Sequence, residues 1–197
     1  MNATMRLLPP LVIAVAAGLA ACASDPPTRF HSLQSATAAR TPPCAPQPLL
    51  DLGPAAVPSG VGQPQWVVRL PDGSLRVLEQ ERWVAPLRDE LRAALLAGLR
   101  ERQATGDVRT AASPVPPAWR VRVDVTRFDT IAGQGAWLEA RWTAVPPSGT
   151  AGFACEVSLK ESSESDPLAL AAAHRKAAAR LADRLGTSLA AGRCEAN

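Results

Sequence analysis

The chain has 197 residues and a formal net charge of +3, and its basic residues are mostly arginines because only Lys160 and Lys176 are lysines. The arginines stand among acidic residues along amphipathic segments, without the basic stripe and interleaved aromatics of a nucleic-acid-binding protein, and this class is excluded. The two histidines, His31 and His174, stand alone, so no metal-ligand spacing is present. Phosphate-loop and nucleophile–base motifs are also missing, and we expect a non-catalytic protein without a cofactor.

The N-terminal stretch has the features of a secretory signal peptide. Arg6 precedes an apolar run from Leu7 to Leu19, which is short for a membrane span. The run closes with Leu19-Ala20-Ala21-Cys22, which resembles the lipobox of bacterial lipoproteins, where the cysteine is acylated and becomes the new N-terminus. We expect residues 1–21 to be removed, Cys22 to carry the lipid and residues 22–28 to form a tether. An ordinary cleaved signal with a chance cysteine is the alternative.

The residues after Cys22 bear on its destination. Ala23 and Ser24 follow, and Asp25 stands one place too late for the inner-membrane retention signal of lipoproteins. By resemblance to that sorting rule, the predicted location is the outer membrane, with the protein facing the periplasm. Acyl chains such as palmitate would hold it there, because two chains suffice for stable anchoring.

Three cysteines remain for the folded domain. In an oxidising periplasm they allow one disulfide and one free thiol. We predict a bond between Cys155 and Cys194, because the final helix would return the C-terminus to the strand that carries Cys155. Cys44 could replace either partner.

The strand signals begin soon after the tether, in residues 29–197, which are expected to form one domain. Arg29 to Leu33, with His31 facing solvent, and Leu49 to Leu52 are predicted strands. Two β-branched runs flank Pro71-Asp72-Gly73-Ser74 and predict a hairpin, because proline and glycine suit the turn. Residues 119–128, 136–145 and 153–160 alternate apolar and polar side chains and predict an antiparallel meander with one wet face.

Two amphipathic helices complete the predicted fold. The first has about 16 residues, starts at Pro86 and ends near Gly106. The second starts at Pro167 after the capping residue Asp166, with His174 at the edge of its apolar face. The expected class is therefore α+β, a mostly antiparallel sheet with both helices packed on one face.

Short motifs follow one another in a characteristic order in the first half of the domain: Phe30-His31-Ser32-Leu33, Gly53-Pro54 with Pro58, Pro64-Gln65-Trp66-Val67-Val68-Arg69, and Glu81-Arg82-Trp83 before Pro86-Leu87. This order resembles a known family, the ABC-type transport auxiliary lipoproteins, which are PqiC-like partners of MCE lipid-transport systems. The likeness is firmest from Gly53 to Leu99, and Gly60-Val61-Gly62-Gln63 departs from the family pattern. It implies structural or docking roles for a set of motif residues. These are Gly53, Pro54, Pro58, Pro64, Gln65, Arg69, Arg82, Trp83 and Pro86. For Trp83, we favour a packing role within the fold over a role as a contact site.

The resemblance implies a lipoprotein that docks an inner-membrane MCE/ABC-type transport complex, supports phospholipid transport and membrane integrity, and assembles with copies of itself. The candidate docking loops are Ser59 to Gln63 and Ser35 to Gln47. The alternative is a structural or regulatory periplasmic lipoprotein that activates a cell-wall enzyme, but the short tether favours docking. Direct lipid carriage would require an apolar cavity, for which a sheet with one apolar face leaves no room.

Overall fold

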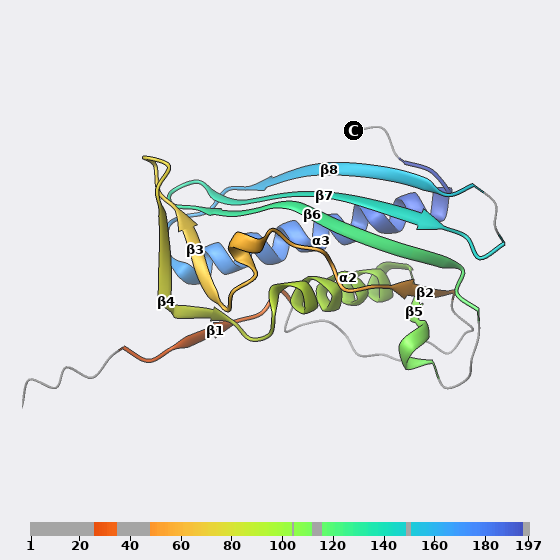
Figure 1. Ribbon diagram of the computed structural model, residues 1–197, viewed down its shortest axis with the longest axis horizontal. Helices are drawn as coiled ribbons and strands as arrows, with labels where there is room; N and C mark the ends of the chain where they lie inside the picture. The colour runs from red at the N-terminus through yellow and green to blue at the C-terminus, as the bar shows by residue number, and fades with distance from the viewer. Residues whose placement is uncertain (1–25, 35–47, 104, 112–115, 149–150, 195–197) are drawn as a thin grey trace, which may run out of the picture.

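The computed structural model describes residues 26–34, 48–103, 105–111, 116–148 and 151–194 (Figure 1). Cys22 and Cys44, and the candidate docking loop from Ser35 to Gln47, lie outside these ranges. The elements follow the chain in a fixed order: β1 (Arg29–His31), β2 (Leu49–Leu52), the 3-10 turn η2 (Ser59–Val61), β3 (Gln65–Arg69), β4 (Leu75–Trp83), α2 (Leu87–Gln103), β5 (Gly106–Asp107), the 3-10 turn η3 (Val108–Thr110), β6 (Trp119–Ile131), β7 (Gly135–Val145), β8 (Phe153–Glu161) and α3 (Pro167–Ala191).

The eight strands form one sheet around β6. One edge of β6 pairs antiparallel with β7 along its length, and β7 pairs antiparallel with β8, which confirms the predicted meander. The other edge of β6 is shared, because β2 pairs with its first residues and β3 with its last, both in parallel. The β3–β4 hairpin is also confirmed, with Gly73 at φ 86° in the turn.

The prediction of a mostly antiparallel sheet was wrong, because the sheet is mixed. Besides the two parallel contacts of β6, β1 pairs in parallel with β4 and β2 with β5. The parallel pairs of β2 and β3 arise because the chain returns to β5 and β6 through α2, and a crossover of this kind brings strands back in the same direction. The connection between β1 and β4 runs through β2 and β3 instead. The predicted α+β class stands.

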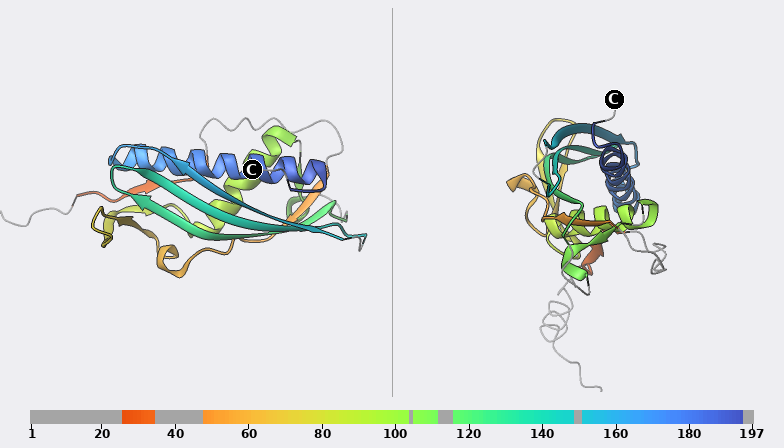
Figure 2. Two further views of the ribbon diagram at one scale, coloured as in Figure 1. Left: turned by 90° about the horizontal axis from the view of Figure 1, so that it is seen from above. Right: turned by 90° about the vertical axis from the view of Figure 1, so that its right-hand side faces the viewer.

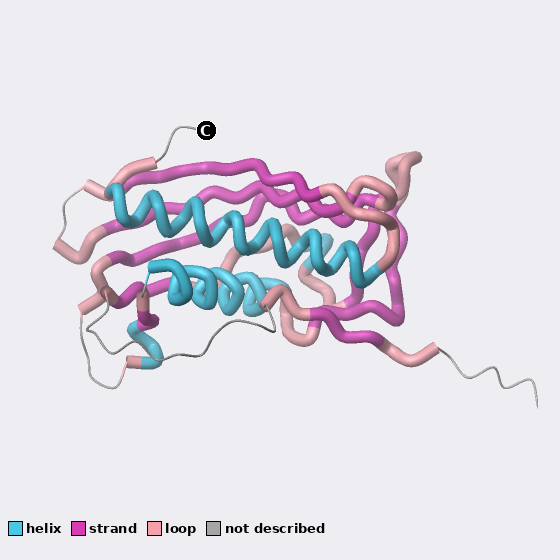
Figure 3. Tube along the Cα trace, turned by 180° about the vertical axis from the view of Figure 1, so that it is seen from behind, coloured by secondary structure: helices cyan, strands magenta, loops and turns pink. Residues whose placement is uncertain are grey.

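Both helices lie on the same side of the sheet, as predicted (Figure 3). The strands curve around them when the molecule is seen from its end (Figure 2). Leu87, Leu91, Leu95 and Leu99 of α2 are buried in one core with the inward face of the meander and the apolar face of α3. The helices approach closely at Gly98, where a Cβ atom would lie 2.7 Å from Cβ of Ala182.

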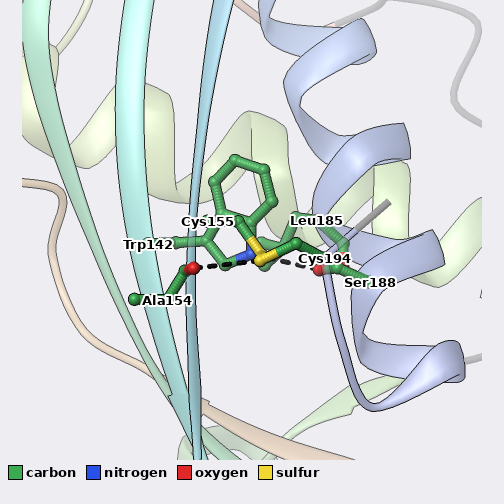
Figure 4. Close-up of a disulfide and its surroundings, with 6 residues drawn as sticks. All are labelled: Trp142, Ala154, Cys155, Leu185, Ser188 and Cys194. Carbon is green, nitrogen blue, oxygen red and sulfur yellow. Dashed lines mark hydrogen bonds between the residues drawn. A yellow bond between two sulfur atoms is a disulfide. The ribbon is translucent and has the colours of Figure 1, made fainter. Parts of the chain in front are cut away.

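The ends of α3 follow the predicted signals. The Asp166 carboxylate accepts hydrogen bonds from the backbone N–H groups of Leu168 and Ala169, and Pro167 opens the helix. Gly192 ends it in the left-handed conformation at φ 66°. The chain then turns back to β8, where Cys194 and Cys155 form a disulfide with Cα atoms 5.5 Å apart (Figure 4). This is the pairing that the sequence analysis favoured.

Both histidines were misplaced by the sequence analysis. His31 was expected to face solvent, but it is 5% exposed, whereas its neighbour Phe30 is 63% exposed. The β1 pattern was therefore read one residue out of phase, which moves every side chain to the other face. His174, predicted at the edge of the apolar face of α3, is completely buried.

Candidate functional site

A buried glutamate fastens the first described strand to the rest of the sheet. Glu81 of β4 is 4% exposed and lies opposite Arg29 of β1 in the parallel register. Its carboxylate accepts a hydrogen bond from Arg29 Nε at 2.8 Å and contacts His31 Nε2 at 2.6 Å. Because Glu81 and His31 are both hidden from solvent, this pair holds the strand and is not open to a substrate.

A second buried glutamate joins the end of β1 to a helix. Glu90 lies in the first turn of α2, and its Oε2 atom accepts hydrogen bonds from Ser32 Oγ at 2.7 Å and from the Leu33 backbone N–H at 2.8 Å. A carboxylate at this position also interacts favourably with the positive end of the helix. Thus Glu81 and Glu90 together tie the segment that follows the predicted tether to β4 and α2.

Aromatic and histidine side chains pack behind these glutamates in what we call the aromatic cluster, formed by His31, Trp66, Trp83, Phe128 and His174. The Trp66 ring lies 4.5 Å from His31 and 4.6 Å from Trp83 between centroids. His174 stacks on Phe128 at 4.3 Å. The cluster joins side chains from β1, β3, β4, β6 and α3.

His174 is held neutral within the aromatic cluster. Its Nε2 atom lies 2.8 Å from Thr130 Oγ1. Burial lowers the pKa of His174 to about 3, and the nearby charge of Asp129 opposes the shift only in part. The side chain is therefore uncharged at neutral pH and serves the packing of the core.

The structure brings part of the predicted motif together at the bend of β4. The Pro64 carbonyl accepts a hydrogen bond from the Trp83 N–H at 3.0 Å, and Gln65 pairs with Arg82 across a bulge. Trp83 itself is buried in the aromatic cluster, in keeping with the favoured packing role. Pro86 lies just before α2, and its carbonyl accepts from the N–H groups of Asp89 and Glu90.

The remaining motif residues lie elsewhere. Arg69 sits at the hairpin end of β3, with its Nη2 atom 3.6 Å from Asp129 Oδ1. Gly53 and Pro54 follow β2, and the chain there continues beside β6 through a bridge between Ala56 and Asp124. Pro58 precedes η2, which forms the start of the candidate docking loop from Ser59 to Gln63. The motif is therefore spread over the fold and does not form one site.

The sequence analysis missed the buried carboxylates of Glu81, Glu90, Asp107 and Glu161. None of them sits in an apolar run, so hydrophobic periodicity alone does not predict their burial. A signal was present for Glu90, since an acid in the first turn of a helix that follows a strand is well placed to accept backbone N–H groups. For Glu81 the pairing of β1 with β4 had to be known first.

The comparison with protein families identifies the chain. A model of the ABC-type transport auxiliary lipoprotein component matches residues 31–186. The chain belongs to this family. The matched span begins at His31 in β1 and ends within α3, so it takes in the aromatic cluster and the buried Glu81 and Glu90 of this auxiliary lipoprotein. No curated protein matches the chain.

Two solved structures share the fold of the auxiliary lipoprotein. A protein of uncharacterised function aligns with a TM-score of 0.63 at 16% identity, covering 83% of this chain and 99% of its own. A protein from Xanthomonas campestris aligns with a TM-score of 0.56 at 21% identity, covering 85% of this chain and 94% of its own. In the described part of the auxiliary lipoprotein, no helix combines the length and apolar character needed to cross a membrane.

Proposed function

We propose that this protein is an outer-membrane lipoprotein, anchored through Cys22 and facing the periplasm, that docks an inner-membrane MCE/ABC-type transport complex. In this role it supports phospholipid transport across the periplasm and membrane integrity. The observation that carries the proposal is the family match over residues 31–186. The lipobox at Leu19 to Cys22 supplies the anchor.

The contacts that bind β1 to the core support a docking role. Cys22 stands four residues before Pro26, and four extended residues reach at most about 14 Å. A lipid on Cys22 would therefore keep the start of the domain close to the membrane. Glu81 and Glu90 bind the segment from Arg29 to Leu33 to β4 and α2. A lipid that holds this segment near the membrane would therefore also hold the folded core there.

The anchor is tested by replacing the acylated residue. We expect the wild-type protein to incorporate radiolabelled palmitate and to fractionate with outer membranes. Cys22→Ser should lose the label and leave that fraction, whereas Cys44→Ser, a second cysteine outside the described residues, should behave as wild type. Label retained by Cys22→Ser, or wild-type protein in the inner-membrane fraction, would contradict the proposed location.

The partner is tested by crosslinking the acylated protein in its native membranes, purifying it in detergent and identifying bound proteins by mass spectrometry. Recovery of an MCE-domain protein is expected. Recovery of a cell-wall synthase without an MCE-domain protein would instead favour the alternative function, a structural or regulatory lipoprotein that activates a cell-wall enzyme. We also propose self-assembly, for which β8 offers a free edge, because within the described residues it pairs only with β7. A monomer by light scattering, with and without detergent, would contradict it.

A further inference from the structure

The sheet face that carries no helix contains a hollow of about 620 Å³ where β2, η3, β6 and β7 meet. We call it the arginine hollow, and its lining includes Asp51, Gly53, Arg109, Arg120, Arg122 and Thr143. These elements meet at the right-hand end of the molecule in Figure 1, opposite the end where β1 enters. The volume is in the range of small-molecule sites.

Positive charge predominates in the arginine hollow, since three arginines face one aspartate. Arg109 Nη2 lies 3.6 Å from Asp51 Oδ1, so that pair is balanced. The side chains of Arg120 and Arg122 have no ion pair or hydrogen bond within the part of the chain that the structure describes. Further along the same face the charges are matched, because Arg141 Nε lies 3.7 Å from Glu156 Oε2.

The walls of the arginine hollow are fixed by the core. Arg120 and Arg122 lie two residues apart on the exposed side of β6, opposite Val145 and Thr143 of β7. The backbone N–H of Arg109 donates to the buried carboxylate of Asp107, which also pairs with Arg92 of α2. The positions of the three arginines along the backbone are therefore set before any ligand arrives.

Arg92 also fixes the β2 side of the arginine hollow, because its Nε atom donates to the Leu52 carbonyl at 2.9 Å. Gly53 follows directly, and its own N–H donates to the Val121 carbonyl at 3.4 Å. A Cβ atom on Gly53 would meet nothing within 4 Å, and Gly53 is not among the glycines with positive φ. Neither packing nor backbone geometry requires a glycine here, and its missing side chain leaves the hollow open.

We infer that the arginine hollow binds a phosphate ester through Arg120 and Arg122. Guanidinium groups match the oxygens of phosphate in paired hydrogen bonds, and the Thr143 hydroxyl can donate a further one. The inference rests on the proposed function only for the source of the phosphate, which would be the headgroup of an anionic phospholipid. A soluble phosphate ester has the same chemistry, and the experiment separates the two sources.

The test uses the acylated full-length protein in dodecyl maltoside. Dihexanoyl phosphatidylglycerol and glycerophosphoglycerol are titrated separately by isothermal calorimetry at low salt. We expect saturable binding that weakens at least about tenfold in Arg120→Gln/Arg122→Gln, because hydrogen bonds to charged groups are lost. Gly53→Leu, which fills the hollow, should also weaken binding. Arg141→Gln removes an arginine from the same face outside the hollow and should leave binding unchanged.

Each outcome has one meaning. Binding of the lipid at least about tenfold tighter than its headgroup identifies a lipid source, and equal binding identifies a soluble phosphate ester. No saturable binding of either ligand, or equal binding by wild type and the double variant at matched unfolding midpoints, would overturn the inference. Binding that persists while no MCE-domain protein is recovered from membranes would contradict the proposed function alone.

Discussion

Gly135, at the start of β7, occupies a place that no other residue can take without strain. Its φ is +110°, and a Cβ atom there would lie 2.0 Å from the Glu161 carbonyl oxygen and 2.7 Å from the Ser163 nitrogen. Both neighbours are backbone atoms at the end of β8, so they cannot move aside as a flexible side chain would. The close approach of the β6–β7 turn to the end of β8 therefore depends on a missing side chain.

Gly135→Ala should lower the free energy of unfolding by at least about 3 kcal/mol, since it combines a disfavoured backbone conformation with a steric clash. Urea denaturation followed by tryptophan fluorescence measures the change. Gly53→Ala is the matched control, because its Cβ atom meets nothing and its φ is not in the left-handed region. It should change stability by less than about 1 kcal/mol. Equal effects of the two substitutions would contradict this account of Gly135.

The buried His174 makes stability depend on pH. Its pKa of about 3 lies below the value of 6.5 expected in the unfolded chain, so the unfolded state binds more protons between these values. The contribution of neutral His174 to the free energy of unfolding is fully present above pH 6.5 and falls on acidification. The fall is roughly 1.4 kcal/mol per pH unit where the unfolded state binds one proton more than the folded state. We expect His174→Gln, which cannot titrate but can still contact Thr130, to lose most of this slope between pH 6.5 and 4.5. Parallel slopes in the two proteins would show that another group is responsible.

Single residues also show where prediction from sequence ended. The Asp166 cap and the Gly73 turn were predictable because their chemistry is local to a few residues. The burial of His31 was not, because Phe30-His31 fits a strand in either phase and only the pairing with Glu81 decides which side faces in.

At the scale of elements, β6 explains both what the sequence predicted and what it missed. Its residues 119–126 alternate cleanly, up to a register shift between Val125 and Arg127, so the strand and its hairpin partner β7 were predictable. Its opposite edge is long enough to receive β2 at one end and β3 at the other. Those parallel pairings depend on where long connections return the chain, and hydrophobic alternation carries no information about that.

The disulfide joins two elements that are far apart in the chain. Cys155 in β8 and Cys194 after α3 are separated by 39 residues, so the bond closes the unfolded chain into a long loop. Replacing both cysteines with serine should cost about 2–4 kcal/mol of unfolding free energy, and adding a reductant should do the same to the wild type. Cys44→Ser should have no effect. A reductant-sensitive Cys155→Ser/Cys194→Ser variant would indicate that Cys44 takes part in a different bond.

At the scale of the whole molecule, the two ends of the fold differ in character. At one end β1 follows the predicted lipid anchor, and Phe30 and Val84 expose apolar side chains, at 63% and 59%. At the other end the arginine hollow combines residues from β2, η3, β6 and β7. Of the motif residues only Gly53 lines the hollow, and the sequence does not mark its arginines, because the lining residues meet only after the mixed sheet has formed.

The most direct test of the central claim is photocrosslinking in living cells. A photoreactive amino acid is placed at exposed positions on the two ends and on the helix face, for example at Val84, Thr143 and Lys176. The account predicts that at least one position captures an MCE-domain protein and that the capture disappears when Cys22 is replaced by serine. If no position captures such a protein, or if a cell-wall enzyme is captured in its place, the docking role is contradicted.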